Sequence, residues 1–467
     1  MFKSRAVFCA VFAMAIMVSA CGGGGTSTPA PAQVSNHDWR YLRGNQSATG
    51  EVVTPFAAKA GAFVESWATP AGGTSVGVRV GDVTGDGVND LVVISSNAIN
   101  VYDVAGNQVG TPIALPANSE GTCAILEDVD GDGANEILVG SANSANMQIN
   151  IYKANGTLLK TLRRTGGFDS YMRPVAYLGN NKLLVSYTTG FALQPRGYAV
   201  WDISTATPTE TWFYSTGPAI GTVSMGDSNA DGVPDFVSVT STPHNGATGN
   251  GINGTGTPTN DQTLAAIMLD INGTELLSAT VGANTAGGAK SGAYNRLVDI
   301  DGNGVPEIVT TVSHYFAYPG DAQVQVLNLD GSIRHFVSVG VDASPTILIG
   351  DIDNNGQKEI VEAGSAANDI RVLDATLTPI ATRTLPAGAG PWVASGALAD
   401  IDGDGIKEIL LPHGGTLRVL NGMTLVEKWN HVFAGATSLQ AFAADLNGDN
   451  RAEVIVRTSD GVVHVLQ

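Results

Sequence analysis

One nine-residue pattern recurs seven times along the chain and constrains its fold more than any other feature. In order it holds an acid, any residue, Asp/Asn/Thr, any residue, Asp/Asn, Gly (Asn in one copy), two residues of any kind, and a closing Asp or Glu. An apolar run follows each copy at once, such as Leu91–Ile94 after the first. Turns that recur between short apolar segments are typical of a protein assembled from repeated β units.

The polar positions of the pattern carry the oxygen atoms that a calcium ion prefers. Ca²⁺ takes about six to eight oxygen ligands at roughly 2.3–2.6 Å. Side chains at positions 1, 3 and 5 of a tight loop converge on one point, and the acid at position 9 closes the shell. Position 6 must tolerate a left-handed backbone, and it is glycine in six copies and Asn450 in the seventh. We therefore predict up to seven structural calcium ions.

The predicted calcium ligands are the side chains at positions 1, 3, 5 and 9 of each copy. They are Asp82, Thr84, Asp86, Asp90, Asp128, Asp130, Asp132, Glu136, Asp227, Asn229, Asp231, Asp235, Asp299, Asp301, Asn303, Glu307, Asp351, Asp353, Asn355, Glu359, Asp400, Asp402, Asp404, Glu408, Asp445, Asn447, Asp449 and Glu453. The alternative interpretation of a single copy is a hairpin turn rich in Asx and glycine that binds no ion. The shared register of turn residue and acids over seven copies favours the metal sites.

The spacing of the loops predicts an all-β, eight-bladed β-propeller, with seven blades as the alternative. Most gaps between loop starts are 45 to 52 residues, and the gap from Asp128 to Asp227 is about double. A plain turn at residues 179–181 stands where a loop is missing. Each unit has room for four short strands, which is typical of a propeller blade. The last unit ends after three strands, and residues 63–69 are expected to supply its fourth and close the ring.

These units resemble the FG-GAP, or VCBS-type, repeats of integrin α-subunit propellers and many bacterial surface proteins. The resemblance covers roughly residues 63–467 and rests on the seven loops. It implies a propeller with calcium loops between the first and second strands of most blades. Thr84 in the first loop and the missing loop of the third unit depart from the family pattern, so calcium is least expected there.

The N-terminal residues predict export and attachment to a membrane by lipid. Lys3 and Arg5 precede 13 apolar residues, which as a helix would rise only about 20 Å, too little to span a bilayer. Residues 1–20 therefore predict a signal peptide. Residues 18–21, Val-Ser-Ala-Cys, resemble the lipobox of bacterial lipoproteins, which implies lipid on Cys21. Gly22 after it implies sorting to the outer membrane, and an ordinary signal peptide is the alternative.

The rest of the chain divides into a linker and the propeller. Residues 21–36, rich in Gly, Ser, Thr and Pro, predict a flexible linker, and residues 37–467 the propeller. Cys123 is expected to be a buried strand residue, and Asp38-Trp39-Arg40 a packing element. Residues 188–197, 241–262 and 313–318 predict long loops opposite the calcium loops. Their candidate binding residues are Phe191, Arg196, His244, His314, Tyr315 and Tyr318.

Charge and motifs favour a binding protein over a catalyst. The net charge of −19 argues against binding to nucleic acid. No phosphate loop or zinc spacing occurs. We therefore predict an adhesion or scaffolding module with protein or glycan partners at the cell surface. The alternative is a calcium-dependent polysaccharide-active enzyme of the lyase type. Such an enzyme should gather cations near its central channel, and the 24 Lys and Arg show no cluster in the sequence.

Overall fold

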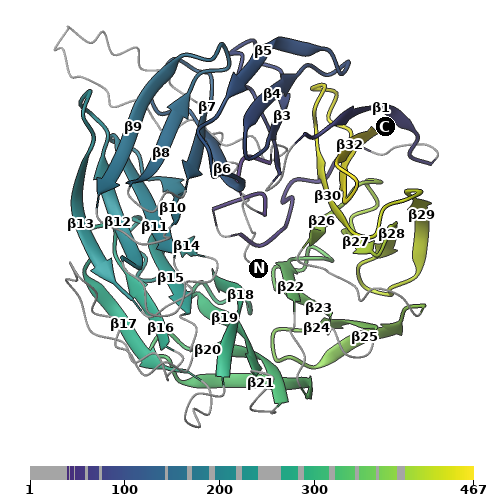
Figure 1. Ribbon diagram of the computed structural model, residues 1–467. Coiled ribbons are helices and arrows are strands. Elements are labelled where there is room, and N and C mark those ends of the chain that lie inside the picture. The colour runs from purple at the N-terminus through teal and green to yellow at the C-terminus, as the bar shows by residue number, and fades with distance from the viewer. Residues whose placement is uncertain are drawn as a thin grey trace, which may run out of the picture. The chain divides into compact units, whose positions relative to one another are not determined.

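The strands of the protein pair into eight antiparallel sheets of four strands each. The computed structural model describes residues 39–467 except 42, 47, 58–61, 73–75, 142–145, 166–170, 189–194, 217–222, 240–264, 282–288, 315–320, 342–345, 364–367 and 387–394. Within Ser35–Gln467 the sheets follow one another around a ring, with the first strand of each nearest the middle (Figure 1). The predicted eight-bladed β-propeller is confirmed, and the seven-bladed alternative is wrong.

The blades are numbered in chain order, and the strands of each blade are ordered from the innermost outward. Blades 1 to 4 are β2 (Gly77–Gly81), β3 (Asp90–Ile94), β4 (Ala98–Tyr102), β5 (Gln108–Ala114); β6 (Ser119–Glu127), β7 (Glu136–Ser141), β8 (Asn146–Tyr152), β9 (Leu158–Thr165); β10 (Tyr171–Tyr177), β11 (Lys182–Thr188), β12 (Gly197–Asp202), β13 (Thr209–Ser215); β14 (Ser224–Gly226), β15 (Asp235–Val239), β16 (Ala265–Leu269) and β17 (Glu275–Thr280).

The remaining four blades follow the same order. Blades 5 to 8 are β18 (Ala289–Val298), β19 (Glu307–His314), β20 (Asp321–Leu327), β21 (Ile333–Val341); β22 (Thr346–Gly350), β23 (Glu359–Ala363), β24 (Asp369–Leu373), β25 (Pro379–Thr384); β26 (Ala397–Ala399), β27 (Glu408–His413), β28 (Thr416–Asn421), β29 (Glu427–Val432); β30 (Leu439–Ala444), β31 (Glu453–Thr458), β32 (Val462–Leu466) and β1 (Glu65–Pro70).

Burial explains why inner and outer strands differ in composition. Every residue of β3 is buried, because both faces of this strand pack against neighbouring blades. The outer strand β29 instead alternates half-buried and exposed residues, as expected of a strand with one solvated face. Apolar side chains of adjacent blades share one core; Ile94 of blade 1, for example, lies in the same cluster as Leu126 and Ile137 of blade 2.

The ring is closed by pairing the two ends of the propeller sequence. β1 lies antiparallel to β32, with Trp67 opposite Val465 and Thr69 opposite Val463. The indole of Trp67 also donates to the carbonyl oxygen of Val104 in blade 1 at 3.0 Å. The predicted closing strand at residues 63–69 is thus confirmed at Glu65–Pro70. This pairing leaves blade 8 complete and joins it to blade 1.

A segment before β1, Trp39–Ala57, lies near the middle of the ring, and we call it the strap (Figure 1). Because the first strand of each blade turns its free edge towards the axis, its backbone groups need partners there. The strap exchanges backbone hydrogen bonds of 2.6–3.3 Å with blades 1, 2, 4, 6, 7 and 8. Its partners in these blades are Val80, Leu126, Met225, Ile349, Leu398, Asp400 and Asn450.

Side chains also hold the strap in place. Trp39 stacks on Phe442 of blade 8 with ring centroids 4.7 Å apart, which confirms its predicted packing role. The carboxylate of Glu51 lies 3.2 Å from the ammonium of Lys407 and 3.7 Å from that of Lys358. It also accepts the backbone N–H of Asp351 at 3.1 Å. Glu51 and Lys407 are almost fully buried, so the strap carries a buried ion pair into blades 6 and 7.

We predict that Glu51→Gln destabilises the protein, because it leaves the buried ammonium of Lys407 without a counter-charge. The unfolding free energy should fall by about 3 kcal/mol, the usual effect of removing one partner of a buried ion pair. Urea unfolding followed by tryptophan fluorescence measures it. Glu65→Gln is the matched control, because its pair with His464 is exposed and should contribute less than about 1 kcal/mol. Equal losses in both variants would contradict the anchoring role of Glu51.

Candidate metal centres

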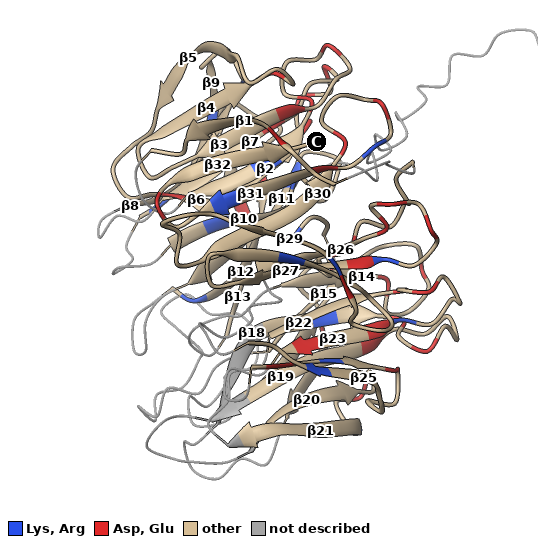
Figure 2. Cartoon of the chain, turned by 90° about the vertical axis from the view of Figure 1, so that its right-hand side faces the viewer, with Lys and Arg blue, Asp and Glu red and all other residues tan. Residues whose placement is uncertain are grey.

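The seven predicted metal loops open on one face of the ring. Each joins the first strand of a blade to the second, as Asp82 to Asn89 joins β2 to β3. Because all inner strands run in the same direction, their C-terminal ends and the loops that follow lie together. Figure 2 shows acidic residues gathered in the loops along this side of the sheets. Blade 3 has the predicted plain turn instead, in which Asn180 and Asn181 both have positive φ.

One hydrogen-bonded frame recurs in all seven loops. The carboxylate at position 1 accepts the N–H of position 6 at 2.8–3.0 Å. The side chain at position 5 accepts the N–H of position 7 at 2.7–3.0 Å. The closing acid accepts the N–H of position 2 at 2.7–3.1 Å. The repeated pattern therefore specifies a repeated three-dimensional shape.

The backbone of the frame turns twice through the left-handed region. At position 6, φ is +81° to +93° for the six glycines and +62° for Asn450, as the sequence predicts. Position 4 is also left-handed, with φ between +57° and +80°, and it holds glycine in five loops, Ala230 in one and Asn354 in another. The sequence reasoning missed this second turn position, although the five glycines at position 4 were a visible signal.

Carboxylates converge in four of the seven loops. One oxygen atom from each of three acids lies within 4.8 Å of the other two in the loops that begin at Asp128, Asp299, Asp351 and Asp400. That separation is about twice a calcium–oxygen distance, so one ion fits between the three atoms. The loops that begin at Asp82, Asp227 and Asp445 have Thr or Asn at position 3, and no such triad forms there among the described residues. A hard oxygen-donor set of this kind suits calcium.

The closing acids sit in an environment that opposes their negative charge. Burial, the largest cause, together with the nearby loop aspartates raises the pKa of Glu136, Glu359, Glu408 and Glu453 to about 7. Burial likewise raises the pKa of Asp90, Asp235 and Glu307. Each loop thus holds more negative charge than its hydrogen bonds compensate. A cation bound in the loop would offset this charge.

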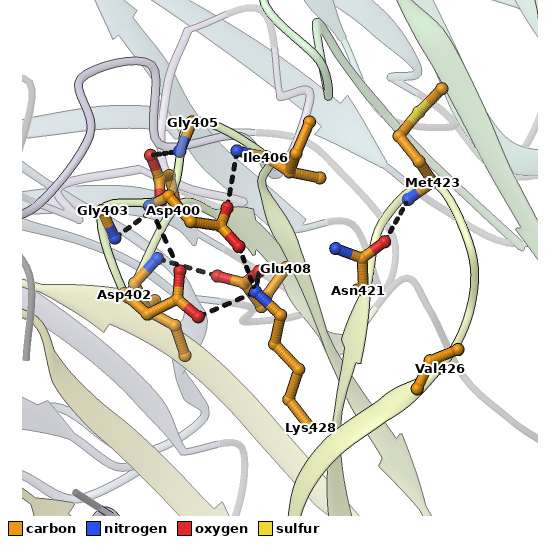
Figure 3. A network of polar contacts seen from close by, with 12 residues as sticks. Asp400, Asp402, Gly403, Gly405, Ile406, Glu408, Asn421, Met423, Val426 and Lys428 are labelled. Atoms are coloured by element: carbon orange, nitrogen blue, oxygen red, sulfur yellow. Dashed lines mark hydrogen bonds and ion pairs between the residues drawn. The ribbon is translucent and has the colours of Figure 1, made fainter. Parts of the chain in front are cut away.

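In three loops the chain itself places a cation among the acids. The ammonium of Lys428 lies 2.7 Å from carboxylate oxygens of Asp402, Asp404 and Glu408 (Figure 3). Arg334 contacts Asp301 at 2.6 Å and Glu307 at 2.5 Å in blade 5. Lys428 and Arg334 each occupy the second residue of a fourth strand, β29 and β21. The apolar Ile380 holds that place in blade 6.

Lys153 supplies the third such cation, in blade 2. Its ammonium contacts Asp132 and lies 2.8 Å from Asp130 and 3.8 Å from Glu136. In blade 6, by contrast, no described Lys or Arg pairs with the converging carboxylates of Asp351, Asp353 and Glu359. This loop is therefore the strongest candidate metal centre. The sequence did not reveal the tethered cations, because they lie some 20 to 35 residues after the acids they contact.

The loops also connect neighbouring blades. The side chain of Asn89 donates to the carbonyl oxygen of Asp445 at 2.7 Å, and that of Asn135 donates to the carbonyl oxygen of Asp82 at 2.9 Å. In blades 6 and 7, the backbone N–H groups of Lys358 and Lys407 donate to the loop of the preceding blade at 2.9 Å. Any ion that stiffens one loop therefore also supports a contact with the next blade.

Several predicted residues lie outside the described part of the chain or fail as candidates. The signal peptide, Cys21 and the linker lie outside it, as do Phe191, His244, Tyr315 and Tyr318. Among the described residues, no helix is long and apolar enough to cross a membrane. Arg196 is fully buried, so its place in a predicted surface is wrong. Cys123 lies in β6 as predicted but is only half-buried.

Basic residues do gather near the axis, contrary to the interpretation of the sequence. Arg43, Arg79 and Arg457 line one cavity together with Trp39 and Phe442. They come from the strap, from β2 and from β31, which are far apart in the sequence. The visible signal was a single arginine within an otherwise apolar inner strand, but only the ring brings these arginines together.

The sequence profile of the FG-GAP-like repeat matches two segments, residues 82–139 and 351–411. The first segment holds the loops of blades 1 and 2, and the second holds those of blades 6 and 7. Together with the fold, these matches show a propeller of FG-GAP repeats. Comparison with curated protein sequences finds no significant match.

Solved structures share the fold at low sequence identity. The biofilm matrix protein Bap1 of V. cholerae is 14% identical with a TM-score of 0.52, over 89% of this chain and 90% of that one. Quinohemoprotein alcohol dehydrogenase from Comamonas testosteroni is 11% identical with a TM-score of 0.56, over 93% and 81%. The exotype rhamnogalacturonan lyase YesX is 16% identical with a TM-score of 0.51, over 88% and 75%. These similarities show a common architecture.

We predict that Lys428→Met makes blade 7 depend on calcium. Without the ammonium, Asp402, Asp404 and Glu408 repel one another, so the unfolding temperature in chelator should fall below that of the unaltered protein. Added calcium should then raise it by more than it raises the unaltered protein. Differential scanning calorimetry with and without calcium measures both effects.

The matched control for this substitution is Lys182→Met. Lys182 pairs with Asp202 at 2.6 Å in blade 3, which has no metal loop. Its removal should leave the response to calcium unchanged. If Lys428→Met and Lys182→Met respond to calcium alike, Lys428 does not serve as the counter-charge of its loop.

Proposed function

We propose that this propeller of FG-GAP repeats is a calcium-stabilised lipoprotein of the cell envelope that binds protein or glycan partners at the cell surface. The observation that carries the proposal is the common frame of seven acidic loops on one face. The blade 6 loop supports it most directly, because Asp351, Asp353 and Glu359 converge there and no described Lys or Arg pairs with them.

In this proposal the ions are structural. A calcium ion in a loop neutralises the carboxylates at positions 1, 3, 5 and 9 and fixes the hairpin between the first two strands of the blade. An ion that binds the folded chain and not the unfolded chain stabilises the fold by mass action. Because adjacent loops contact one another, seven ions would strengthen the whole ring rather than isolated hairpins.

The fold itself does not choose between adhesion and catalysis. A biofilm matrix protein and a rhamnogalacturonan lyase share the architecture, and similar propellers serve unrelated roles. A binding or scaffolding role is favoured because the sequence has no phosphate-loop or zinc-site motif. The rigid ring and its loops are the kind of scaffold on which proteins build recognition surfaces.

A calcium-dependent enzyme acting on acidic polysaccharides is the second candidate. One observation favours it: Arg43, Arg79 and Arg457 line a common cavity near the axis. The Lys and Arg residues show no cluster along the sequence, but the ring brings these three together, so their spacing in the sequence does not count against an enzyme. An assay for unsaturated sugar released from acidic polysaccharides distinguishes this candidate from a pure binding module.

We predict that chelation lowers the unfolding temperature and that added calcium restores it. At ten times the dissociation constant, each independent site adds about 1.4 kcal/mol to the stability of the fold. Calorimetry in EDTA and in calcium gives the shift, and elemental analysis of the dialysed protein gives the number of bound ions. Magnesium should substitute poorly, since it requires a tighter octahedral shell. An unfolding temperature that ignores both EDTA and calcium would rule out structural calcium.

We predict that Cys21→Ser releases the protein from membranes, because the substitution removes the sulfur that would carry lipid. The unaltered protein should enter the detergent phase of a Triton X-114 partition, and the variant should stay in the aqueous phase. Cys123→Ser is the control, since Cys123 lies in the propeller and should not affect partitioning. Detergent partitioning of Cys21→Ser would show that Cys21 is not the anchor.

A further inference from the structure

Two adjoining cavities lie on the face of the ring opposite the metal loops. The smaller, of about 70 Å³, is lined by the strap and by residues at the N-terminal ends of inner strands, among them Val76 and Gly77. The larger, of about 310 Å³, lies between blades 7 and 8. Both are lined by Ser395, Gln440 and Arg457, so they lie side by side, and we treat them as two parts of one site. We call it the axial pocket.

Arg43 brings an uncompensated charge into the axial pocket. Its Nε and Nη1 atoms are buried and have no hydrogen-bond partner among the described residues. Its guanidinium lies 4.3 Å from the ring centroid of Tyr294, a contact that positions the group without neutralising it. The fully buried Arg296 lies close enough that the charge of Arg43 adds to burial in lowering the pKa of Arg296.

Arg457 and Arg79 add positive charge to the same wall. The Nε of Arg457 is buried without a partner among the described residues, and its Nη1 makes only a long contact of 3.4 Å to Gln440. Arg79 donates to the carbonyl oxygens of Ala124, Val78 and Thr122 at 2.7–2.8 Å, so its position is fixed. Within the described residues, no Asp or Glu forms an ion pair with Arg43, Arg79 or Arg457.

Such an arrangement is costly unless something else supplies negative charge. Burying even part of a cation without a counter-ion opposes folding. The chain has 43 acidic residues for its 24 Lys and Arg, so a shortage of carboxylates does not explain the unpaired arginines. Guanidinium groups bind carboxylates and other oxyanions through paired, charge-assisted hydrogen bonds. The free nitrogens of Arg43 and Arg457 are therefore available to an anionic group from outside.

The larger part of the axial pocket suits a polyhydroxylated ring. It is lined by the polar residues Thr437, Ser438, Ser459 and Gln440, next to the apolar Leu439. A few polar groups on a partly apolar wall are typical of sites that bind small molecules. The volume of the larger cavity is also in the range of such sites. We propose that the axial pocket binds an acidic sugar residue, with the sugar's carboxylate on Arg43 and Arg457 and its hydroxyl groups on the Ser/Thr wall.

This inference deepens the proposed function, because it names a glycan class as ligand, but it does not depend on calcium. The pocket lies at the opposite ends of the strands from the metal loops. If the protein binds acidic sugar and its stability does not change on chelation, the pocket proposal stands and the calcium proposal is wrong. If its stability depends on calcium and it binds no acidic sugar, the calcium proposal stands and the pocket proposal is wrong. The two proposals therefore fail separately.

Calorimetric titration of the full-length protein with tri-galacturonate, in calcium and at low salt, tests the pocket. Binding should be at least tenfold tighter than binding of neutral galactotriose. Arg43→Gln and Arg457→Gln should each weaken tri-galacturonate binding at least tenfold and leave the weak galactotriose binding unchanged. Arg457→Gln keeps the test valid if Arg43→Gln disturbs the strap, since Arg457 lies at the end of β31 and is half-exposed.

Arg163→Gln is the matched control, because Arg163 lies exposed on the outer strand β9, where its Nη2 bonds Gln148 at 3.1 Å. It should bind tri-galacturonate like the unaltered protein. The proposal is overturned if tri-galacturonate and galactotriose bind equally, or if the two pocket variants match the control. It is also overturned if inorganic sulfate competes as strongly as the sugar acid, because the pocket would then recognise only a bare anion.

Discussion

The pairing of β1 with β32 is the interaction on which the rest of the structure depends. It makes the eighth sheet complete and joins the two ends of the repeat array, so that no outer edge of the array remains open. A closed ring turns every inner strand towards one axis. The free edges of these strands then require partners, and the strap supplies them for six blades. The axial pocket exists only because the strap and the inner strands meet there.

Charge is separated between the two faces of this ring. Acidic loops follow the C-terminal ends of the inner strands, whereas Arg43, Arg79 and Arg457 gather near the N-terminal ends. Each set lacks sufficient counter-charge of its own among the described residues. The acidic face suits small metal cations, and the basic pocket suits an anion. A protein with a net charge of −19 thus contains one site whose local charge is opposite to its total.

The loops differ in how their charge is balanced, and this difference was not visible in the repeat. Blades 5 and 7 carry Arg334 and Lys428 on the fourth strand, so the charged end of a side chain lies among the acids that are predicted to bind metal. Blade 6 has Ile380 at the same place, and no described Lys or Arg pairs with its converging carboxylates. The seven loops share one local sequence pattern, but they differ in the charged residues that surround them. Because those residues lie outside the repeated pattern, the sequence predicts the same metal site in every loop.

The sequence by itself predicted eight blades, with seven as the alternative, a closing strand at residues 63–69 and the turn at position 6 of the loops. The loop shape follows from residues that lie close together in the chain, since the frame joins residues no more than seven apart. Only the tertiary structure decided where Arg43 and Arg457 meet, that Arg196 is buried, and which acids Lys428 contacts. Such contacts join segments that come together only when the sheets pack around the axis. A local sequence pattern does not specify which side chains, distant in the sequence, come into contact when the ring closes.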